Sequence, residues 1–124
     1  MKNFQVAIIG GGVVGCSIAR ELSKYKLDIV VFEMGSDVAS GASKANSGVV
    51  HSGINSPPPS LKARFCVKGN KMFQSLADEL GFPVKWVGKF IIAKNKEEVR
   101  ELERLRKVGR DNSIPGLELK EKMR

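Results

Sequence analysis

Three glycines near the N-terminus and one acidic residue downstream have the types and spacing of a dinucleotide site. Gly10, Gly12 and Gly15 form a G-x-G-x-x-G pattern directly after an apolar run. In such a pattern the first glycine permits a tight turn, the second lets a pyrophosphate approach the backbone, and the third allows close packing of helix on strand. Glu33 follows at close to the distance of roughly 20 residues at which an acid accepts hydrogen bonds from a ribose.

The flanking residues predict the elements that would position this chemistry. Val6–Ile9 reads as a strand, and a helix is expected to begin near Val13, so that the N–H groups of Val13 and Val14 face the phosphates. Residues 28–33 read as a second strand, whose continuous apolar character suits a parallel sheet. The alternative is a glycine-rich turn in another kind of α/β unit.

Composition indicates an ordinary globular protein with an excess of basic residues. The 124 residues carry a formal net charge of +8, most of it after residue 56. Such a bias suits nucleic acid, an anionic membrane surface, an anionic substrate or simply a solvated helical surface. No aromatic residues are interleaved with the basic ones to stack on bases, so we predict no nucleic-acid partner. No stretch is apolar enough to span a membrane, although peripheral membrane contact stays open.

The two cysteines and the N-terminus bear on the compartment. Cys16 and Cys66 lie on separate predicted helices without C-x-x-C spacing, and we expect both to be small buried fillers in a reduced compartment. The N-terminus leads directly into a strand without a signal-peptide pattern. Both features favour the cytoplasm.

Further elements are expected after a tract of small residues at 35–53. A helix over residues 61–80 is predicted between a Ser60 cap and a Gly81 stop, with an apolar stripe facing inward. Next we expect two short strands, at 84–87 and 89–93. They are followed by a second helix near 96–109, which a capping box of Asn95 and Glu98 would open. A brief strand at 117–119 and the start of another helix close the chain. A doubly wound sheet needs more strands than these, so we expect an N-terminal fragment of a longer protein.

The fingerprint with Glu33, together with Gly41 to Gly53, resembles the FAD-dependent oxidoreductases of the D-amino acid oxidase superfamily. The likeness is nearest to its branch of L-2-hydroxyglutarate dehydrogenases and glycerol-3-phosphate dehydrogenase-like proteins, which residues 60–64 and 88–93 also match. It implies an incomplete α/β fold: a Rossmann-like FAD-binding βαβ unit in domain 1–82 and the start of an antiparallel substrate-domain sheet in 83–124. The cofactor-binding residues would be Gly10, Gly12, Val13, Val14, Gly15, Glu33, Met34, Ser43, Asn46, Ser47, Gly48 and His51.

The resemblance also implies a reaction. FAD would accept a hydride from a small anionic hydroxy substrate such as glycerol 3-phosphate or L-2-hydroxyglutarate. In this superfamily most of the substrate site lies beyond the residues present, so no catalytic base is named, and we expect this chain alone to be inactive and prone to self-association. The alternatives are an NAD(P)-linked dehydrogenase and a non-catalytic nucleotide-binding fragment.

His51, the sole histidine, has three interpretations. It could line the flavin site and contact substrate or ring, it could be a structural hydrogen-bonding residue, or it could be a covalent attachment point for the flavin. One histidine without a cluster of other ligands does not make a metal site.

Overall fold

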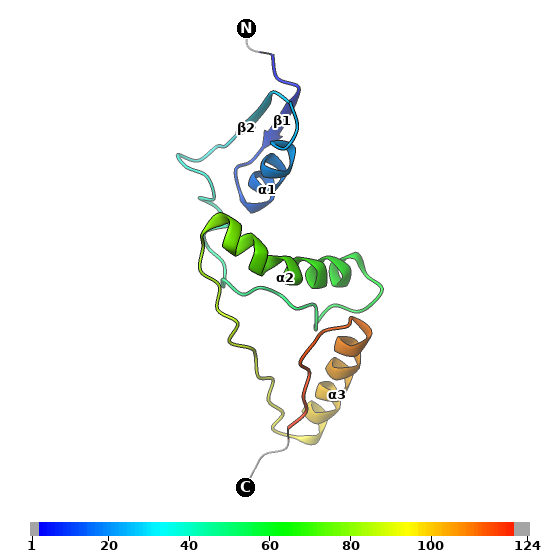
Figure 1. Cartoon of the computed structure of the whole chain (residues 1–124). Coiled ribbons are helices and arrows are strands. Elements are labelled where there is room, and N and C mark those ends of the chain that lie inside the picture. Colours follow the sequence, from blue (N-terminus) through cyan, green and yellow to red (C-terminus); the bar gives the residue numbers. More distant parts are fainter. Residues whose placement is uncertain (1–2, 121–124) are drawn as a thin grey trace. The chain divides into compact units, whose positions relative to one another are not determined.

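The computed structural model describes residues 3–120, which form two compact units divided between Gly48 and Val49 (Figure 1). The first unit contains strand β1 (Val6–Ile9), helix α1 (Val13–Leu22) and strand β2 (Ile29–Phe32). The strands are parallel and in register, with Val6 opposite Ile29 and Ile9 opposite Phe32. Parallel strands joined by a helix make a βαβ unit, which confirms the predicted Rossmann-like α/β class.

Helix α1 begins where the glycine pattern predicts. Gly12 is its N-cap, and the N–H of Cys16 donates to the Gly12 carbonyl at 2.9 Å. Ile8 is buried beneath the helix and is 8% exposed. Two expectations were wrong: Ile18, whose spacing from Leu22 predicts a core-facing position on α1, is 46% exposed, and Cys16, predicted to be a buried filler, is exposed. Within residues 3–120 the sheet has two strands, and Gly15 is the one buried residue of α1.

Helix α2 (Leu61–Leu80), in the second unit, has both of its predicted ends. The Ser60 side chain accepts a hydrogen bond from the Ala63 N–H at 3.2 Å, and Gly81 adopts a left-handed φ of 70°. These are a side-chain N-cap and a glycine stop. The buried positions of the helix are Ala63 and Ala77.

The expected apolar stripe of α2 is only partly buried. Leu61, Phe65 and Leu80 are 53–66% exposed, contrary to the prediction. The small side chains of Ala63 and Ala77 are covered by nearby residues, whereas the larger side chains of the stripe are not fully covered. Phe73 does pack, edge-on, against Phe82 with ring centroids 5.8 Å apart.

Helix α3 (Lys96–Asp111) opens with the predicted capping box. The Asn95 side chain accepts from the Glu98 N–H at 2.9 Å, and the Glu98 carboxylate accepts from the Lys94 N–H at 2.7 Å. Val99 and Leu105 are both predicted to face inward on this helix; Leu105 is buried at 8% exposure, whereas Val99 is 44% exposed, contrary to the prediction.

The predicted short strands are not formed. Residues 84–94 are extended without a strand, and residues 117–119 likewise lack one within the described chain. Val87, Phe90 and Ile92 are 76–88% exposed. A strand needs a partner to satisfy its backbone, and Gly88 alone is too short a connection for the two runs to pair with each other. The helix expected at the C-terminal end lies outside the described residues.

None of the helices within residues 3–120 is both long enough and apolar enough to cross a bilayer.

Candidate functional site

The glycine pattern forms a cradle at the C-terminal end of β1. Gly10 has a φ of 97°, and its N–H donates to the Phe32 carbonyl of β2 at 2.7 Å. A Cβ on Gly15 would overlap the carbonyl oxygen of Gly10 and lie 3.3 Å from the Ile8 side chain. Only glycine at position 15 therefore permits this approach of α1 to the strand.

The N-terminus of α1 points its backbone donors into this cradle. The N–H groups of Val13, Val14 and Gly15 come before Cys16, the first residue whose N–H finds a carbonyl within the helix, so the helix itself cannot satisfy them. The Val13 N–H donates to the Ser43 Oγ at 2.8 Å. A Cβ on Gly12 would lie 3.1 Å from that same oxygen, so the absence of a side chain lets the Ser43 hydroxyl approach the backbone there. Such a helix terminus is suited to a phosphate.

Glu33 supplies an anionic acceptor beside the cradle. Its carboxylate accepts from the Gly35 N–H at 2.8 Å and from the Gly11 N–H at 2.6 Å. These hydrogen bonds, the one from Gly35 first, hold the pKa of Glu33 below its usual range. The side chain is therefore ionised at neutral pH and placed at the end of β2, where a ribose hydroxyl could donate to it.

The tract after β2 folds back over the cradle. Asn46 donates from Nδ2 to the Ser43 carbonyl at 2.6 Å and accepts from the Gly48 N–H at 2.8 Å. Gly48 has a φ of 63°. Asn46 thus shapes the loop that presents Ser43. Ser47, which lies in this loop, is exposed. Met34, which follows β2, is fully exposed.

His51 belongs to the second compact unit and is exposed. Its backbone carbonyl accepts from Asn70 Nδ2 of α2 at 3.4 Å. The predicted cofactor residues from Gly10 to Gly48 all lie within the first unit. The three interpretations of His51 stay predictions.

Three participants were missed by sequence reasoning. Gly11 and Gly35 donate to Glu33, and the Ala39 N–H donates to the Gly11 carbonyl at 2.9 Å. Gly11 occupies a variable position of the G-x-G-x-x-G pattern, and Gly35 lies two residues after the acid, a spacing that could have suggested it. Ala39 has a φ of 58°, and an alanine gives no signal for that conformation.

The first unit is a parallel βαβ unit that has a glycine cradle, unsatisfied helix N–H groups and an acid at the end of the second strand. Together these features define a dinucleotide-binding protein. Among the described residues there is no group of three or more His, Cys, Asp or Glu side chains placed to hold a metal. The family "FAD dependent oxidoreductase" matches residues 5–123. The chain belongs to this family, and the predictions of the family and of FAD as its cofactor are confirmed.

Curated relatives agree with this assignment. The glycerol 3-phosphate dehydrogenase of Caloramator mitchellensis is 46% identical over 114 residues, which are 92% of this chain and 24% of the relative. The mitochondrial L-2-hydroxyglutarate dehydrogenase of Dictyostelium discoideum is 42% identical over 120 residues, 95% of this chain and 27% of the relative. The chain therefore spans about a quarter of the length of these relatives.

A solved structure has the same fold. Dithionite-reduced L-alpha-glycerophosphate oxidase from Mycoplasma pneumoniae, with FAD bound, is 38% identical and aligns with a TM-score of 0.83. The alignment covers 92% of this chain and 30% of that one.

Proposed function

We propose that this chain binds FAD in the cradle of the first unit and supplies the cofactor-binding part of an oxidoreductase acting on a small anionic hydroxy compound. Glycerol 3-phosphate and L-2-hydroxyglutarate are the substrates that the names of the relatives support. When bound, FAD supplies the acceptor for a hydride from the hydroxyl-bearing carbon. The observation that carries the proposal is the close approach of Gly15 to Gly10, which requires glycine at position 15 and is typical of a helix terminus that binds a pyrophosphate.

Each part of the cradle has a separate task in this proposal. The N–H groups of Val14 and Gly15 would donate to the pyrophosphate, and the positive end of the α1 dipole would favour its charge. Glu33 would accept from the adenosine ribose, which requires the ionised carboxylate that its hydrogen bonds favour. Ser43, presented by the loop, would lie beside the phosphates.

The remaining residues extend the same proposal toward the flavin. Met34 would lie beside the adenosine, after Glu33. Asn46, Ser47 and Gly48 would follow the ribityl chain, and His51 would reach the flavin region. Residues 1–82 would form the cofactor domain and residues 83–124 the start of a substrate domain. The exposed extended segment at 84–94 supports this division, since its apolar residues suit a sheet formed with further strands.

Two further proposals concern the surroundings of the protein. Both cysteines are free, which fits a reducing compartment such as the cytoplasm. The exposed apolar residues of the two-stranded sheet, Ile9 and Phe32 among them, suit association of one chain with another.

The test is a binding titration on the whole chain. Purified protein is titrated with FAD, and separately with NADH, while the fluorescence of Trp86, the only tryptophan, and of the nucleotide is followed. We expect saturable FAD binding that a bulky Gly15→Val change abolishes. Gly69→Ala is the matched control, because a Cβ there meets nothing within 4 Å.

Turnover is measured separately with FAD, an artificial electron acceptor and either glycerol 3-phosphate or L-2-hydroxyglutarate. The proposed substrate class is supported if the chain, or a longer protein that contains it, reduces the acceptor with one of them. Binding of NADH without binding of FAD would overturn the proposal in favour of an NAD(P)-linked enzyme. Binding of FAD without turnover by the longer protein would leave only a nucleotide-binding role.

A further inference from the structure

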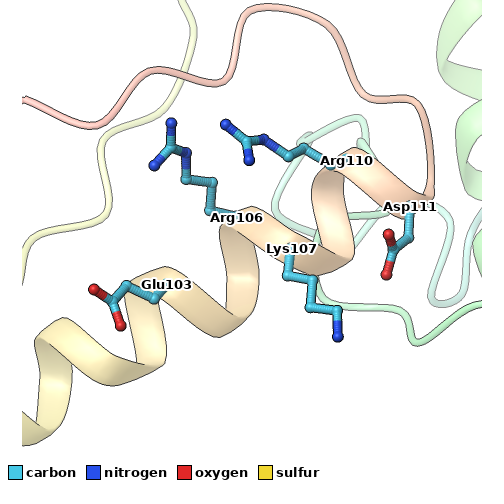
Figure 2. Close-up of a pocket in the computed structure, with 5 residues that line it drawn as sticks. All are labelled: Glu103, Arg106, Lys107, Arg110 and Asp111. Carbon is cyan, nitrogen blue, oxygen red and sulfur yellow. The ribbon is translucent and has the colours of Figure 1, made fainter.

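Helix α3 carries a pocket lined entirely by charged side chains (Figure 2). Its volume is about 460 Å³, and it is lined by Glu103, Arg106, Lys107, Arg110 and Asp111. The pocket belongs to the second unit, and neither the glycine cradle nor the predicted cofactor residues take part in it. Three cations against two carboxylates give the pocket a positive balance.

The two arginines of the pocket share one side of the helix. Arg106 and Arg110 are four residues apart, a spacing that places their side chains next to each other on a helix surface. Figure 2 shows both guanidinium groups on the same side of α3, whereas Lys107 and Asp111 extend to another side. Like charges at this spacing repel each other unless an anion lies between them.

The carboxylates of the pocket do not neutralise these arginines. Glu103 lies three residues before Arg106, the same spacing at which Glu101 pairs with Arg104 at 2.6 Å. Within residues 3–120, however, no ion pair joins Glu103 or Asp111 to a cation of the pocket. In Figure 2 the Glu103 carboxylate points away from the Arg106 guanidinium. The helix thus pairs one arginine internally and leaves the two neighbouring ones without a carboxylate.

Arg106 also has a buried donor without an acceptor. Its Nε is removed from solvent and has no hydrogen-bond partner among the described residues. Leaving a buried donor unpaired costs free energy, which a rotation of the Arg106 side chain that brings Nε to an acceptor would recover. The negative end of the α3 dipole accounts for basic residues near the C-terminus of the helix, but it does not account for a buried Nε–H without a partner.

We propose that Arg106 and Arg110 form a binding site for a single phosphate group. The guanidinium fork matches the oxygens of a phosphate, which can accept from both arginines at once and relieve their mutual repulsion. Lys107 adds positive potential from its neighbouring position. The phosphate could belong to a free phosphate ester or to a lipid headgroup, since both present the same oxygens to the pocket. The site does not depend on FAD binding.

The direct test uses the arginine side chains as reporters. The whole chain, labelled with nitrogen-15, is titrated with sodium phosphate while sodium chloride is reduced to keep the ionic strength constant. We expect the Nε–H signals of Arg106 and Arg110 to shift saturably and the signal of Arg104, already paired with Glu101, to stay in place.

Variants on the same helix separate the site from general charge. Arg106→Gln and Arg110→Gln should each weaken phosphate binding by about tenfold, the loss expected for one charge-assisted hydrogen bond. Arg104→Gln removes the same charge two residues before Arg106, on another side of the helix, and should leave binding unchanged. Far-UV circular dichroism shows whether α3 is intact in each variant. If Arg106→Gln does not fold, the proposal is tested by comparing the phosphate-induced shifts of Arg110→Gln with those of the wild-type chain.

Vesicles distinguish the two sources of phosphate. Sedimentation with phosphatidylcholine vesicles, with or without phosphatidylglycerol, measures binding to a lipid headgroup. Saturable shifts with inorganic phosphate alone support a free phosphate ester, and phosphatidylglycerol binding that both site variants lose supports a lipid. The proposal is wrong if neither probe binds, or if Arg104→Gln weakens binding as much as the site variants do.

Discussion

The substitution Gly15→Ala tests the geometry on which the cofactor site depends. A Cβ at this position would overlap the Gly10 carbonyl oxygen, which is backbone and cannot rotate away. Helix α1 would have to move away from β1, and the contact with the Ile8 side chain, 3.3 Å from the added Cβ, would change with it. Both the stability of the first unit and the shape of the phosphate cradle should suffer.

The expected magnitude follows from two opposing effects. Replacing glycine by alanine in a helix interior stabilises by about 1 kcal/mol, whereas forcing an extra methyl group into a filled site costs about 1–3 kcal/mol. Gly15→Ala should therefore lower the free energy of unfolding by up to about 2 kcal/mol. Gly69→Ala in α2, where a Cβ meets nothing within 4 Å, should raise it by about 1 kcal/mol.

Urea unfolding followed by circular dichroism measures the two variants against the wild-type chain, and FAD titration measures the cradle. The difference between the variants measures mainly the cost of overpacking, because both replace glycine by alanine within a helix. If Gly15→Ala stabilised the protein as Gly69→Ala does and bound FAD as the wild type does, the close approach of α1 to β1 would not be what requires glycine.

Three further predictions concern the caps and the acid. Ser60→Ala should destabilise α2 by about 1 kcal/mol in urea unfolding, since it removes the acceptor for the Ala63 N–H, whereas Ser75→Ala inside the helix should not. Asn112→Ala should cost about 1–3 kcal/mol in the same assay, because its Nδ2 donates to two backbone carbonyls of residues 53 and 56, and Asn112→Asp should fare no better because it cannot donate. The lowered pKa of Glu33 stabilises the fold above the ordinary value of 4.5, and this contribution is lost as the pH falls through the lower folded-state pKa. Unfolding free energies of wild type and Glu33→Gln should converge in acid; parallel curves would contradict the assignment.

The sequence predicted the elements whose signals are local. The structure reproduces the helix ends that were predicted from the glycine after the first apolar run, from Ser60 and from Gly81. These ends are predictable because caps and stops depend on a few neighbouring residues. The acid at the end of β2 was also predicted, since its distance from the glycines is set by one βαβ unit.

Burial and strand pairing were harder to predict because they depend on distant residues. The run at 84–93 has strand propensity, but the structure gives it no partner within residues 3–120. Propensity describes how well a residue fits a sheet and does not supply the neighbouring strand. The burial of Cys16 also depends on residues distant in the sequence: it was expected in a core and is exposed.

The hydrogen bonds of the cradle show how an intact site could be held ready for a cofactor. Ser43 accepts from the Val13 N–H and Glu33 accepts from the Gly11 N–H, so both backbone donors are satisfied within the chain. In the proposed FAD complex, a phosphate would compete with Ser43 for the Val13 donor, and that bond would be exchanged rather than added. Net affinity would then come mainly from the Val14 and Gly15 N–H groups, which α1 cannot satisfy, and from the helix dipole. On this reasoning the internal bonds keep the loop in place, and the unsatisfied helix donors bind the cofactor.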